Sequence, residues 1–282
     1  MLTLNAALEE ACLAIDRVDA LVLAGHVLRM NRAALAANPM RFLSEGEDAR
    51  YASLVAQRAL GQPVAYLLGR REFYSREFAV GPAVLIPRPE TETLVEAALA
   101  RLPATHLAPP ASRGPLTLLD LGTGSGAVGL TIACERPDVR VTATDTSAQA
   151  LEVARGNAEA LGTRVELCQG AWYEPVAARR FDMVVSNPPY VARGDPHLGQ
   201  GDLRFEPPVA LTDGSVDGLA SIRAIAAGAP SHLSPGGWLL LEHGYDQAGA
   251  VAEVLALAGF TDLVSIPDLA GIPRVAGGMI AA

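Results

Sequence analysis

The sequence predicts an α/β protein in which a small helical domain precedes a mostly parallel sheet covered by helices on both faces. Two observations support this prediction. Apolar residues recur at helical spacing through the first 60 residues, and from residue 116 onward short apolar strands alternate with helical segments. Apolar residues make up 50% of the 282 residues, so the chain can bury a substantial core, and its length fits one medium and one smaller domain.

Residues 1–70 are predicted to form the helical domain. Leu4, Leu8 and Cys12 lie four positions apart, as on one face of a helix. The Ser-Glu-Gly-Glu run at 44–47 matches a capping box, which predicts that another helix begins there. The Gly-Gln-Pro run at 61–63 is typical of a helix end.

Residues 71–90 are predicted to link the two domains as a β-hairpin. Aromatic and β-branched residues are frequent between residues 72 and 87, in two runs separated by Gly81 and Pro82. A helical pattern then leads to Leu102. Residues 103–115 contain four prolines and are expected to form a surface loop.

The second domain, residues 91–282, carries the alternation of strands and helices. Helices are expected at 127–136 and 248–259, and residues 262–266 and 274–281 are expected to add two strands near the end of the chain. The main strands are expected at 116–121, 139–144, 164–167, 181–186 and 237–242. Alternation of this kind predicts an open parallel sheet with helices on both faces.

A glycine-rich loop stands where the first strand of this domain gives way to a helix: Gly122, Thr123, Gly124, Ser125 and Gly126. Glycine permits a sharp turn and the close approach of a ligand, and Asp145, after the next strand, is placed to bind ribose hydroxyls. The pattern fits S-adenosyl-methionine, but residues 124–129 also match the G-x-G-x-x-G fingerprint of nicotinamide sites. Asp120 favours the methyl donor, because a carboxylate there suits an ammonium group and repels a pyrophosphate.

An Asn-Pro-Pro-Tyr motif, Asn187, Pro188, Pro189 and Tyr190, follows the fourth strand. It should share one crevice with the glycine loop, since ligands bind beyond the carboxyl ends of parallel strands. Proline carbonyls and the Asn187 side chain offer hydrogen-bond acceptors, and Tyr190 adds an aromatic face. Together these groups can hold a planar NH2 group, aim its lone pair and stabilise the positive charge that develops during methyl transfer. The motif therefore predicts a methyl-acceptor site.

The composition argues against several other classes of protein. The formal charge is −9 and all 22 basic residues are arginine, without the clustered positive charge that a duplex-binding surface needs. The three cysteines, Cys12, Cys134 and Cys168, show no C-x-x-C spacing, so we expect neither a disulfide framework nor a cysteine zinc site. This cysteine content predicts a cytoplasmic location. No signal peptide and no membrane span are expected either.

The sequence resembles the protein-(glutamine-N5) methyltransferases that modify peptide chain release factors. The resemblance covers nearly the whole chain and rests on five segments: 63–69 (Pro-Val-Ala-Tyr-Leu-Leu-Gly), 86–92 (Ile-Pro-Arg-Pro-Glu-Thr-Glu), 120–126, 187–190 and 204–207 (Arg-Phe-Glu-Pro). It implies a Rossmann-like class I methyltransferase domain at 91–282, a substrate-recognition domain at 1–70, and S-adenosyl-L-methionine as donor with no metal. The acceptor it implies is the Gly-Gly-Gln glutamine of class 1 release factors 1 and 2.

The resemblance also implies roles for single residues. The loop from Gly122 to Gly126 would hold the methionine part of the donor, Asp145 the ribose, and Trp172 would lie near the adenine. Asn187 would touch both donor and acceptor, the whole motif would hold the glutamine, and the catalytic residues would be Asn187, Pro188 and Tyr190. The loop at 103–115 is the main departure from the family pattern.

Other interpretations remain open at this point. An amino-directed nucleic-acid methyltransferase, of the N6-adenine type, shares Asn-Pro-Pro-Tyr, but the acidic charge counts against it. A nicotinamide oxidoreductase leaves that motif unexplained, and a non-enzymatic binding module explains neither the motif nor the glycine loop. Arg88 and Glu90 either support the crevice or cap the helix after Pro89.

Overall fold

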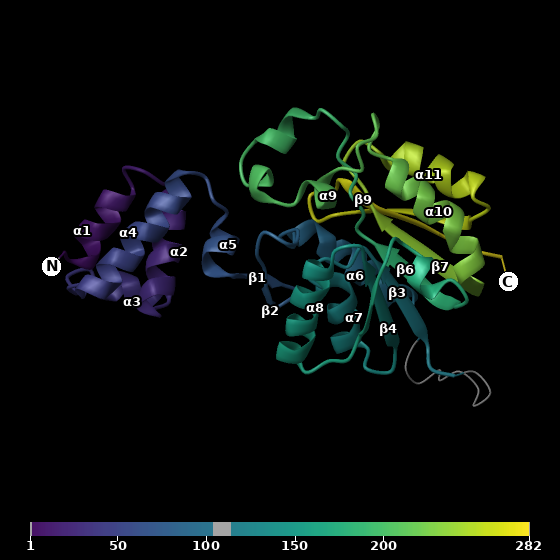
Figure 1. Cartoon of the computed structure of the whole chain (residues 1–282), viewed down its shortest axis with the longest axis horizontal. Coiled ribbons are helices and arrows are strands. Elements are labelled where there is room, and N and C mark those ends of the chain that lie inside the picture. Colours follow the sequence, from purple (N-terminus) through teal and green to yellow (C-terminus); the bar gives the residue numbers. More distant parts are fainter. Residues whose placement is uncertain (1, 104–113, 282) are drawn as a thin grey trace. The chain divides into compact units, whose positions relative to one another are not determined.

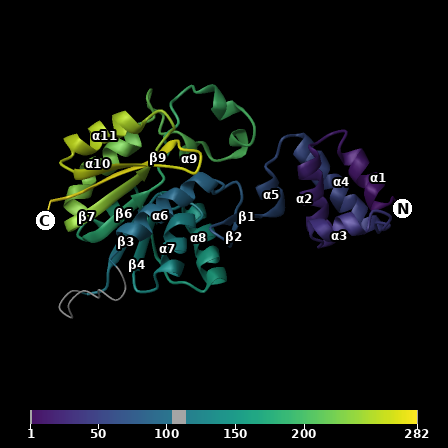
Figure 2. The same cartoon turned by 180° about the vertical axis from the view of Figure 1, so that it is seen from behind.

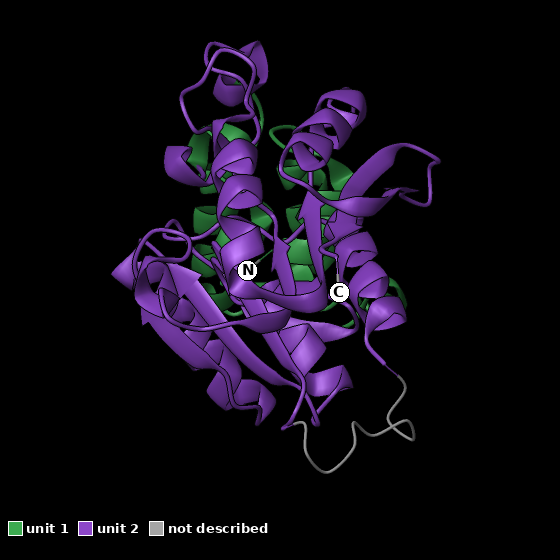
Figure 3. Ribbon diagram, turned by 90° about the vertical axis from the view of Figure 1, so that its right-hand side faces the viewer, with its two compact units in different colours: residues 1–70, 200–205 green, residues 71–199, 206–282 purple. Residues whose placement is uncertain are grey.

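The computed structural model describes residues 2–103 and 114–281, so most of the loop predicted at 103–115 lies outside the described residues. The chain forms two compact units (Figure 3). Unit 1 comprises Met1–Arg70 with Gln200–Phe205, and unit 2 comprises Arg71–Gly199 with Glu206–Ala282. Residues 200–205, which the sequence pattern assigned to the second domain, belong to unit 1 because Asp202 forms an ion pair with Arg58 and Arg204 donates to the carbonyl of Leu60.

Unit 1 is helical. Asp16 caps α2, which accounts for the break after α1, and Ser44 and Glu47 form the predicted capping box of α4. The core gathers apolar side chains from four helices and the segment before α4: Leu4, Leu23, Leu35, Leu43 and Tyr51. The helices are α1 (Leu4–Ala11), α2 (Arg17–Leu28), α3 (Arg32–Ala37), α4 (Glu45–Ala59) and α5 (Val64–Leu68).

A two-stranded hairpin of β1 (Arg70–Phe73) and β2 (Arg76–Ala79) follows. Its turn lies at Tyr74 and Ser75, which both have positive φ, and not at Gly81 and Pro82 as the sequence pattern predicted. Two-residue turns of this kind usually contain Asn or Gly, so a Tyr-Ser turn gives no sequence signal. The second apolar run, around residues 84–86, forms no strand.

The large sheet of unit 2 has the strand order β5-β4-β3-β6-β7-β9-β8. The pairs from β5 to β7 are parallel, and β9 lies antiparallel to both β7 and β8. This confirms the predicted mostly parallel sheet. The strands are β3 (Thr117–Leu121), β4 (Arg140–Asp145), β5 (Glu166–Gln169), β6 (Phe181–Ser186), β7 (Leu233–Glu242), β8 (Thr261–Pro267) and β9 (Pro273–Met279).

Helices cover both faces of this sheet (Figures 1 and 2). Alternate strand residues point to opposite faces, so Leu118 and Leu240 pack in the core with α6 and α7, whereas Leu119 and Leu241 pack in the core with α10 and α11. The helices are α6 (Glu92–Arg101), α7 (Ala127–Glu135), α8 (Ala148–Leu161), α9 (Pro208–Leu211), α10 (Ala220–His232) and α11 (Ala248–Leu257). Short 3-10 helices lie at Pro89–Thr91 (η1), Glu174–Val176, Pro196–Gly199 and Leu203–Phe205.

The strand order places the predicted motifs together. β3 lies between β4 and β6, so the chain runs outward from β3 in both directions across the sheet. Ligands of open α/β sheets bind at such a point, beyond the carboxyl ends of the strands. The glycine loop follows β3, Asp145 ends β4 and Asn187 follows β6, so all three meet at this edge.

Among residues 2–103 and 114–281, no helix combines the length and the apolar character needed to cross a bilayer.

Candidate active site

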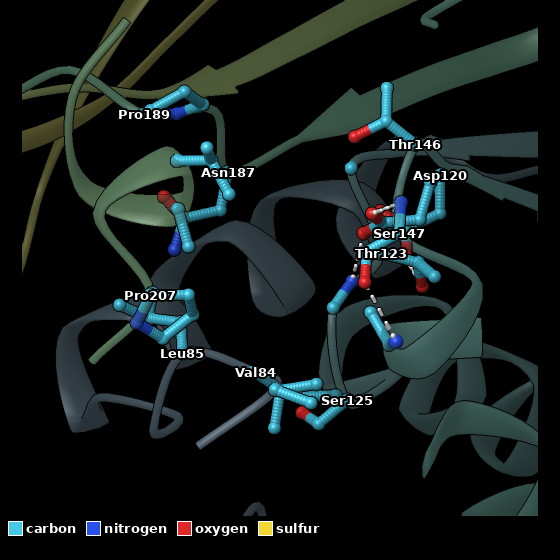
Figure 4. Close-up of a pocket in the computed structure, with 18 of the residues that line it drawn as sticks. Val84, Leu85, Asp120, Thr123, Ser125, Thr146, Ser147, Asn187, Pro189 and Pro207 are labelled. Atoms are coloured by element: carbon cyan, nitrogen blue, oxygen red, sulfur yellow. Dashed lines mark hydrogen bonds between the residues drawn. The ribbon is translucent and has the colours of Figure 1, made fainter. Parts of the chain in front are cut away.

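Unit 2 contains a cavity of about 540 Å³ at the carboxyl ends of β3, β4 and β6. Its size is that of a typical small-molecule site. Figure 4 shows Asn187 and Pro189 on one side of this cavity, across from Asp120 and Thr123 on the other. The predicted site residues that line the cavity are Gly122, Thr123, Gly124, Ser125, Asp145, Trp172, Asn187 and Pro189.

The glycine loop needs its glycines. Gly122, Gly124 and Gly126 have φ of 70°, 56° and 84°, a region that other residues rarely adopt. Gly126 does not line the cavity; it starts α7, where a Cβ would lie 2.6 Å from Leu130 Cδ1. The first turn of α7 follows the loop directly, and its N–H groups have no carbonyl partner within the helix, a feature suited to polar groups.

Asp120 holds this loop from beneath. Its side chain is buried, and its Oδ2 accepts hydrogen bonds from Thr123 Oγ1 at 2.6 Å and from the Gly129 N–H at 3.0 Å. Burial raises the pKa of Asp120 to about 6, against these two hydrogen bonds, which lower it. The sequence pattern suggested an ammonium partner here; the structure adds that one carboxyl oxygen already accepts hydrogen bonds from Thr123 in the loop and Gly129 in α7.

Asp145 joins the end of β4 to the same loop. Its Oδ2 accepts from the Gly124 N–H at 2.9 Å and its Oδ1 from the Ser147 N–H at 2.9 Å. Each carboxylate oxygen has a further lone pair, so Asp145 can still accept two hydroxyl groups from a ligand in the cavity. These contacts fix the orientation of the carboxylate before any ligand arrives.

Trp172 lies close to the glycine loop. A Cβ on Gly122 would come within 3.6 Å of the Trp172 ring, and the Trp172 carbonyl accepts a hydrogen bond from Thr144 Oγ1 at 3.1 Å. Trp172 has φ of +46°, an uncommon conformation for a bulky residue. Its ring lines the cavity, which makes it available as an aromatic surface for a flat ligand group.

The Asn-Pro-Pro-Tyr motif divides into two parts. Asn187 and Pro189 line the cavity, whereas Pro188 is buried and Tyr190 does not line it. Tyr190 donates from its hydroxyl to Glu242 Oε1 at 3.1 Å, and burial raises its pKa. The contact of the Tyr190 ring with an acceptor stays a prediction. Asn187 Nδ2 donates to Thr91 Oγ1 at 3.2 Å, which leaves its carbonyl oxygen for other partners.

Several cavity residues were not named as site residues from the sequence, although Pro87 and Thr91 lie in the 86–92 segment that carries the family resemblance. Val84, Leu85 and Pro87 come from the irregular segment after the hairpin, and Thr91 comes from η1. They lie far along the chain from the motifs that they face, so periodicity and spacing did not single them out.

Glu206 was also missed as a structural anchor. It is buried, pairs with Arg88, and accepts from the Ile86 N–H at 2.9 Å. Of the two interpretations of Arg88, the structure favours support of the crevice, because the Arg88 side chain pairs with Glu206 and makes no capping hydrogen bond with η1.

Metal ligands do not gather in the part of the chain that the structure describes: no group of three or more His, Cys, Asp or Glu side chains lies close enough to hold an ion. His243, after β7, is buried, with Nδ1 at 2.8 Å from the Gly244 carbonyl oxygen. Burial lowers its pKa, which favours the neutral ring.

The fold and the site define a Rossmann-like methyltransferase. Two family models match the chain, the PrmC N-terminal domain over residues 3–69 and the methyltransferase small domain over residues 100–200. Release factor glutamine methyltransferases from Neisseria gonorrhoeae and Xylella fastidiosa are 57% and 51% identical to it, over 79% and 94% of this chain and 79% and 93% of theirs. The chain belongs to the release factor glutamine methyltransferase family.

Solved structures agree with this fold. A methyltransferase from Pyrococcus furiosus has a TM-score of 0.54 at 20% identity, covering 85% of this chain and 100% of that one. The hMettl16 catalytic domain has a TM-score of 0.56 at 13% identity, covering 85% and 83%. At these identities the likeness concerns the fold alone.

Proposed function

We propose that this protein transfers the methyl group of S-adenosyl-L-methionine to the side-chain nitrogen (N5) of the glutamine in the Gly-Gly-Gln motif of peptide chain release factors 1 and 2. One observation carries the proposal. Asn187 lies in the same cavity as the glycine loop and Asp145, and its amide nitrogen is already engaged by Thr91. Its carbonyl oxygen is thereby left to accept a hydrogen bond from a substrate NH2 group.

The glycine loop, Asp145 and Trp172 fit the three parts of the methyl donor. The positive-φ glycines leave room for the methionine part beside the backbone, Asp145 offers acceptors for ribose hydroxyls, and the Trp172 ring offers a surface for adenine. When bound, the donor supplies an electrophilic methyl group on a sulfonium, with a neutral thioether as leaving group.

The acceptor side must make a poor nucleophile reactive. The lone pair of an amide nitrogen is delocalised, so the nitrogen has to be turned until that lone pair faces the methyl carbon. In our proposal Asn187 Oδ1 and the Pro188 carbonyl oxygen each accept a hydrogen bond from the substrate NH2 group. These two acceptors stabilise the positive charge that develops on the nitrogen. The new N–C bond forms as the S–C bond breaks, and the nitrogen then loses one proton. Holding the nitrogen in line also lowers the entropic part of the barrier.

Unit 1 is proposed to recognise the release factor. Its own groove, of about 770 Å³, is lined by apolar residues that include Val18, Val22 and Leu35. Basic residues line it as well, although the whole chain carries −9. Burial and the charges of Arg70 and Arg50 lower the pKa of His26 in this groove, which reflects the positive potential there. The basic lining residues are His26, Arg29, Arg32 and Arg70. Such a surface suits an acidic, partly apolar protein segment.

The remaining features of the proposal have separate grounds. The cysteine content favours the cytoplasm, the net charge of −9 argues against direct contact with nucleic acid, and the family resemblance implies that no metal is needed. The amino-directed nucleic-acid methyltransferases use the same acceptor chemistry and remain the alternative to test.

The test is methyl transfer from labelled donor to purified release factor. Mass spectrometry should find one added methyl group on the glutamine of Gly-Gly-Gln, and none on a release factor in which that glutamine is alanine. Duplex DNA and ribosomal RNA serve as parallel acceptors. Label in a nucleic acid, with none in the release factor, would refute the proposal.

A further inference from the structure

A single side-chain amide joins the Asn-Pro-Pro-Tyr motif to two other segments of unit 2. Gln247 stands in the turn between β7 and α11. Its Nε2 donates to the carbonyl oxygens of Tyr190 and Asp217, at 3.0 Å each. Its Oε1 accepts from the Gly244 N–H at 2.8 Å. The amide thus uses both of its N–H groups and its oxygen, although Gln247 does not line the cavity.

The partners allow only one orientation of this amide. The carbonyl oxygens of Tyr190 and Asp217 can only accept, and the Gly244 N–H can only donate. If the amide turned over, its oxygen would face two carbonyl oxygens and its NH2 group would face another N–H. Gln247 is therefore fixed as a donor to the last residue of the motif.

The motif and residues 211–218 also lie in direct contact. Gly218 has φ of +68°, and a Cβ there would lie 2.1 Å from the Tyr190 carbonyl oxygen, the atom that also accepts from Gln247. Only glycine avoids this clash. The Tyr190 carbonyl is therefore held from two sides, by the Gln247 amide and by the backbone of Gly218.

Hydrogen bonds continue this contact along the chain that leaves the motif. The Val191 N–H donates to the Leu211 carbonyl oxygen at 2.9 Å. The Arg193 N–H donates to the Ser215 carbonyl oxygen at 2.7 Å. Asp213, in the same segment, lines the cavity. The segment is thus one wall of the site, and Gln247 connects that wall to the motif.

The two prolines transmit this restraint to the acceptor atoms. The rings of Pro188 and Pro189 fix their φ angles, so the motif bends little between its ends. Just before the motif the chain is anchored, because Ser186 Oγ donates to the Leu121 carbonyl oxygen at 2.7 Å. When the other end, at Tyr190, is free to move, the Pro188 carbonyl oxygen moves with it.

We propose that Gln247 is a positioning residue that fixes the Tyr190 carbonyl and thereby keeps the Pro188 carbonyl oxygen aimed at the acceptor amide. This inference rests on the proposed function and extends it by a residue outside the cavity. The Tyr190 hydroxyl makes a separate contact with Glu242, so the side chain and the backbone of Tyr190 are held by different residues. Loss of the Gln247 amide therefore frees the backbone and leaves the contact of the hydroxyl in place.

The experiment compares Gln247→Leu and Gln247→Glu in the full-length protein. Leucine removes both N–H donors, whereas glutamate keeps an oxygen for the Gly244 N–H and turns a second oxygen toward the two carbonyls. Gln57→Leu and Gln57→Glu are the matched controls, because the Gln57 amide on α4 of unit 1 also donates to two oxygens, both of Ser53. Steady-state kinetics give kcat and KM for release factor, calorimetry gives the donor Kd, and thermal unfolding tests the fold.

Both Gln247 variants should lower kcat by up to about a hundred-fold, the cost of a misplacement of about 1 Å, with the donor Kd unchanged. The loss in Gln247→Glu should shrink as the pH falls from about 8 to about 5, because the protonated carboxyl regains one O–H donor for a carbonyl oxygen. The loss in Gln247→Leu should lack this change.

The ratio of the two kcat values isolates the introduced carboxyl, because the other titratable groups around Gln247 are the same in both variants. These groups are Asp217 with its partner Arg223, Asp246 in the same turn, and Glu242 and His243 at the end of β7.

Hydrogen exchange followed by mass spectrometry tests the inference without substrate. The N–H groups of Val191 and Arg193 should exchange faster in both Gln247 variants and keep their rates in the Gln57 variants. Three results would overturn the inference: kcat values no lower than those of the Gln57 variants, a loss in Gln247→Glu that is no smaller at low pH, or unchanged exchange in Gln247→Leu. A wild-type protein that fails to methylate release factor would refute the proposed function, and the exchange rates would still decide whether Gln247 holds the motif.

Discussion

Arg88 and Glu206 form an ion pair across 118 positions of sequence, and the Glu206 carboxylate is fully buried. Each stands next to a proline, Pro87 or Pro207, that lines the cavity. The pair therefore fixes the distance between two walls of the site. The Glu206 carboxylate also accepts a hydrogen bond from the Ile86 N–H. It therefore contacts both a backbone group and a side chain of the segment that contains Ile86 and Arg88.

Replacing Glu206 by alanine should destabilise the protein by about 2–3 kcal/mol, since it leaves the Ile86 N–H without an acceptor and Arg88 without its partner. Chemical denaturation measures this change. Asp138→Ala is the control, because its ion pair with Arg136 is exposed and should matter by less than about 1 kcal/mol. Equal losses in the two variants would argue against a special role of Glu206.

Asp145→Ala should weaken donor binding by about 1.5–3 kcal/mol, the usual range for hydrogen bonds to a charged group. The substitution also frees the Gly124 N–H, so the loop loses a fixed point. Calorimetry with S-adenosyl-L-methionine measures the change. Binding of NADH by the wild-type protein, without heat from the methyl donor, would contradict the assignment.

Asn187→Ala should lower kcat by about 10²–10³ while the melting temperature stays close to that of the wild type. The Asn187 carbonyl acts mainly on charge that develops in the transition state, so the loss falls on kcat. Single-turnover methylation of release factor checks this. A normal kcat would mean that another group holds the amide.

Gly126→Ala should be strongly destabilising, because the residue has φ of +84° and a Cβ would lie 2.6 Å from Leu130 Cδ1. Gly156→Ala provides the opposite case. Gly156 lies inside α8 with no atom near the position of its Cβ, so alanine there should stabilise the protein by about 0.5–1 kcal/mol. Urea unfolding measures the free energy of unfolding of both variants. The prediction is wrong if the two substitutions change that free energy in the same direction.

The paired change Arg29→Glu and Arg32→Glu should raise KM for intact release factor several-fold and leave the donor Kd unchanged, because these charges border the groove of unit 1. Arg155→Glu, on the exposed surface of α8, is the control. The effect should weaken at high salt. An unchanged KM would remove the support for recognition by this groove.

Local patterns accounted for much of this molecule. The capping box at Ser44, the glycine loop and the acid at the end of β4 are all set by residues close together in sequence. Strand ends were less well predicted. β7 was predicted to begin at residue 237 but begins at Leu233. The first part of the strand contains Pro235 and Gly236, residues that ordinarily interrupt a strand, and its pairing with β6 is irregular there.

The parts that sequence did not predict depend on contacts between distant segments. Thr91 and Glu206 stand in segments that resemble the family and Glu242 stands in no motif, but only the fold brings them to Asn187, Arg88 and Tyr190. α10 contains Pro230, which obscures its helical pattern. The motif was recognised from the sequence, but the hydrogen bond from Tyr190 to Glu242 was not.

Because residues 200–205 belong to unit 1, each of the two units is built from two separate stretches of the chain. The backbone passes from one unit to the other after Arg70, after Gly199 and after Phe205. If the chain were cut at residue 70, residues 200–205 would stay with unit 2 and lose their partners Arg58 and Leu60. A chimaera that takes residues 1–70 from a homologous protein must therefore also match residues 200–205 to the new helices.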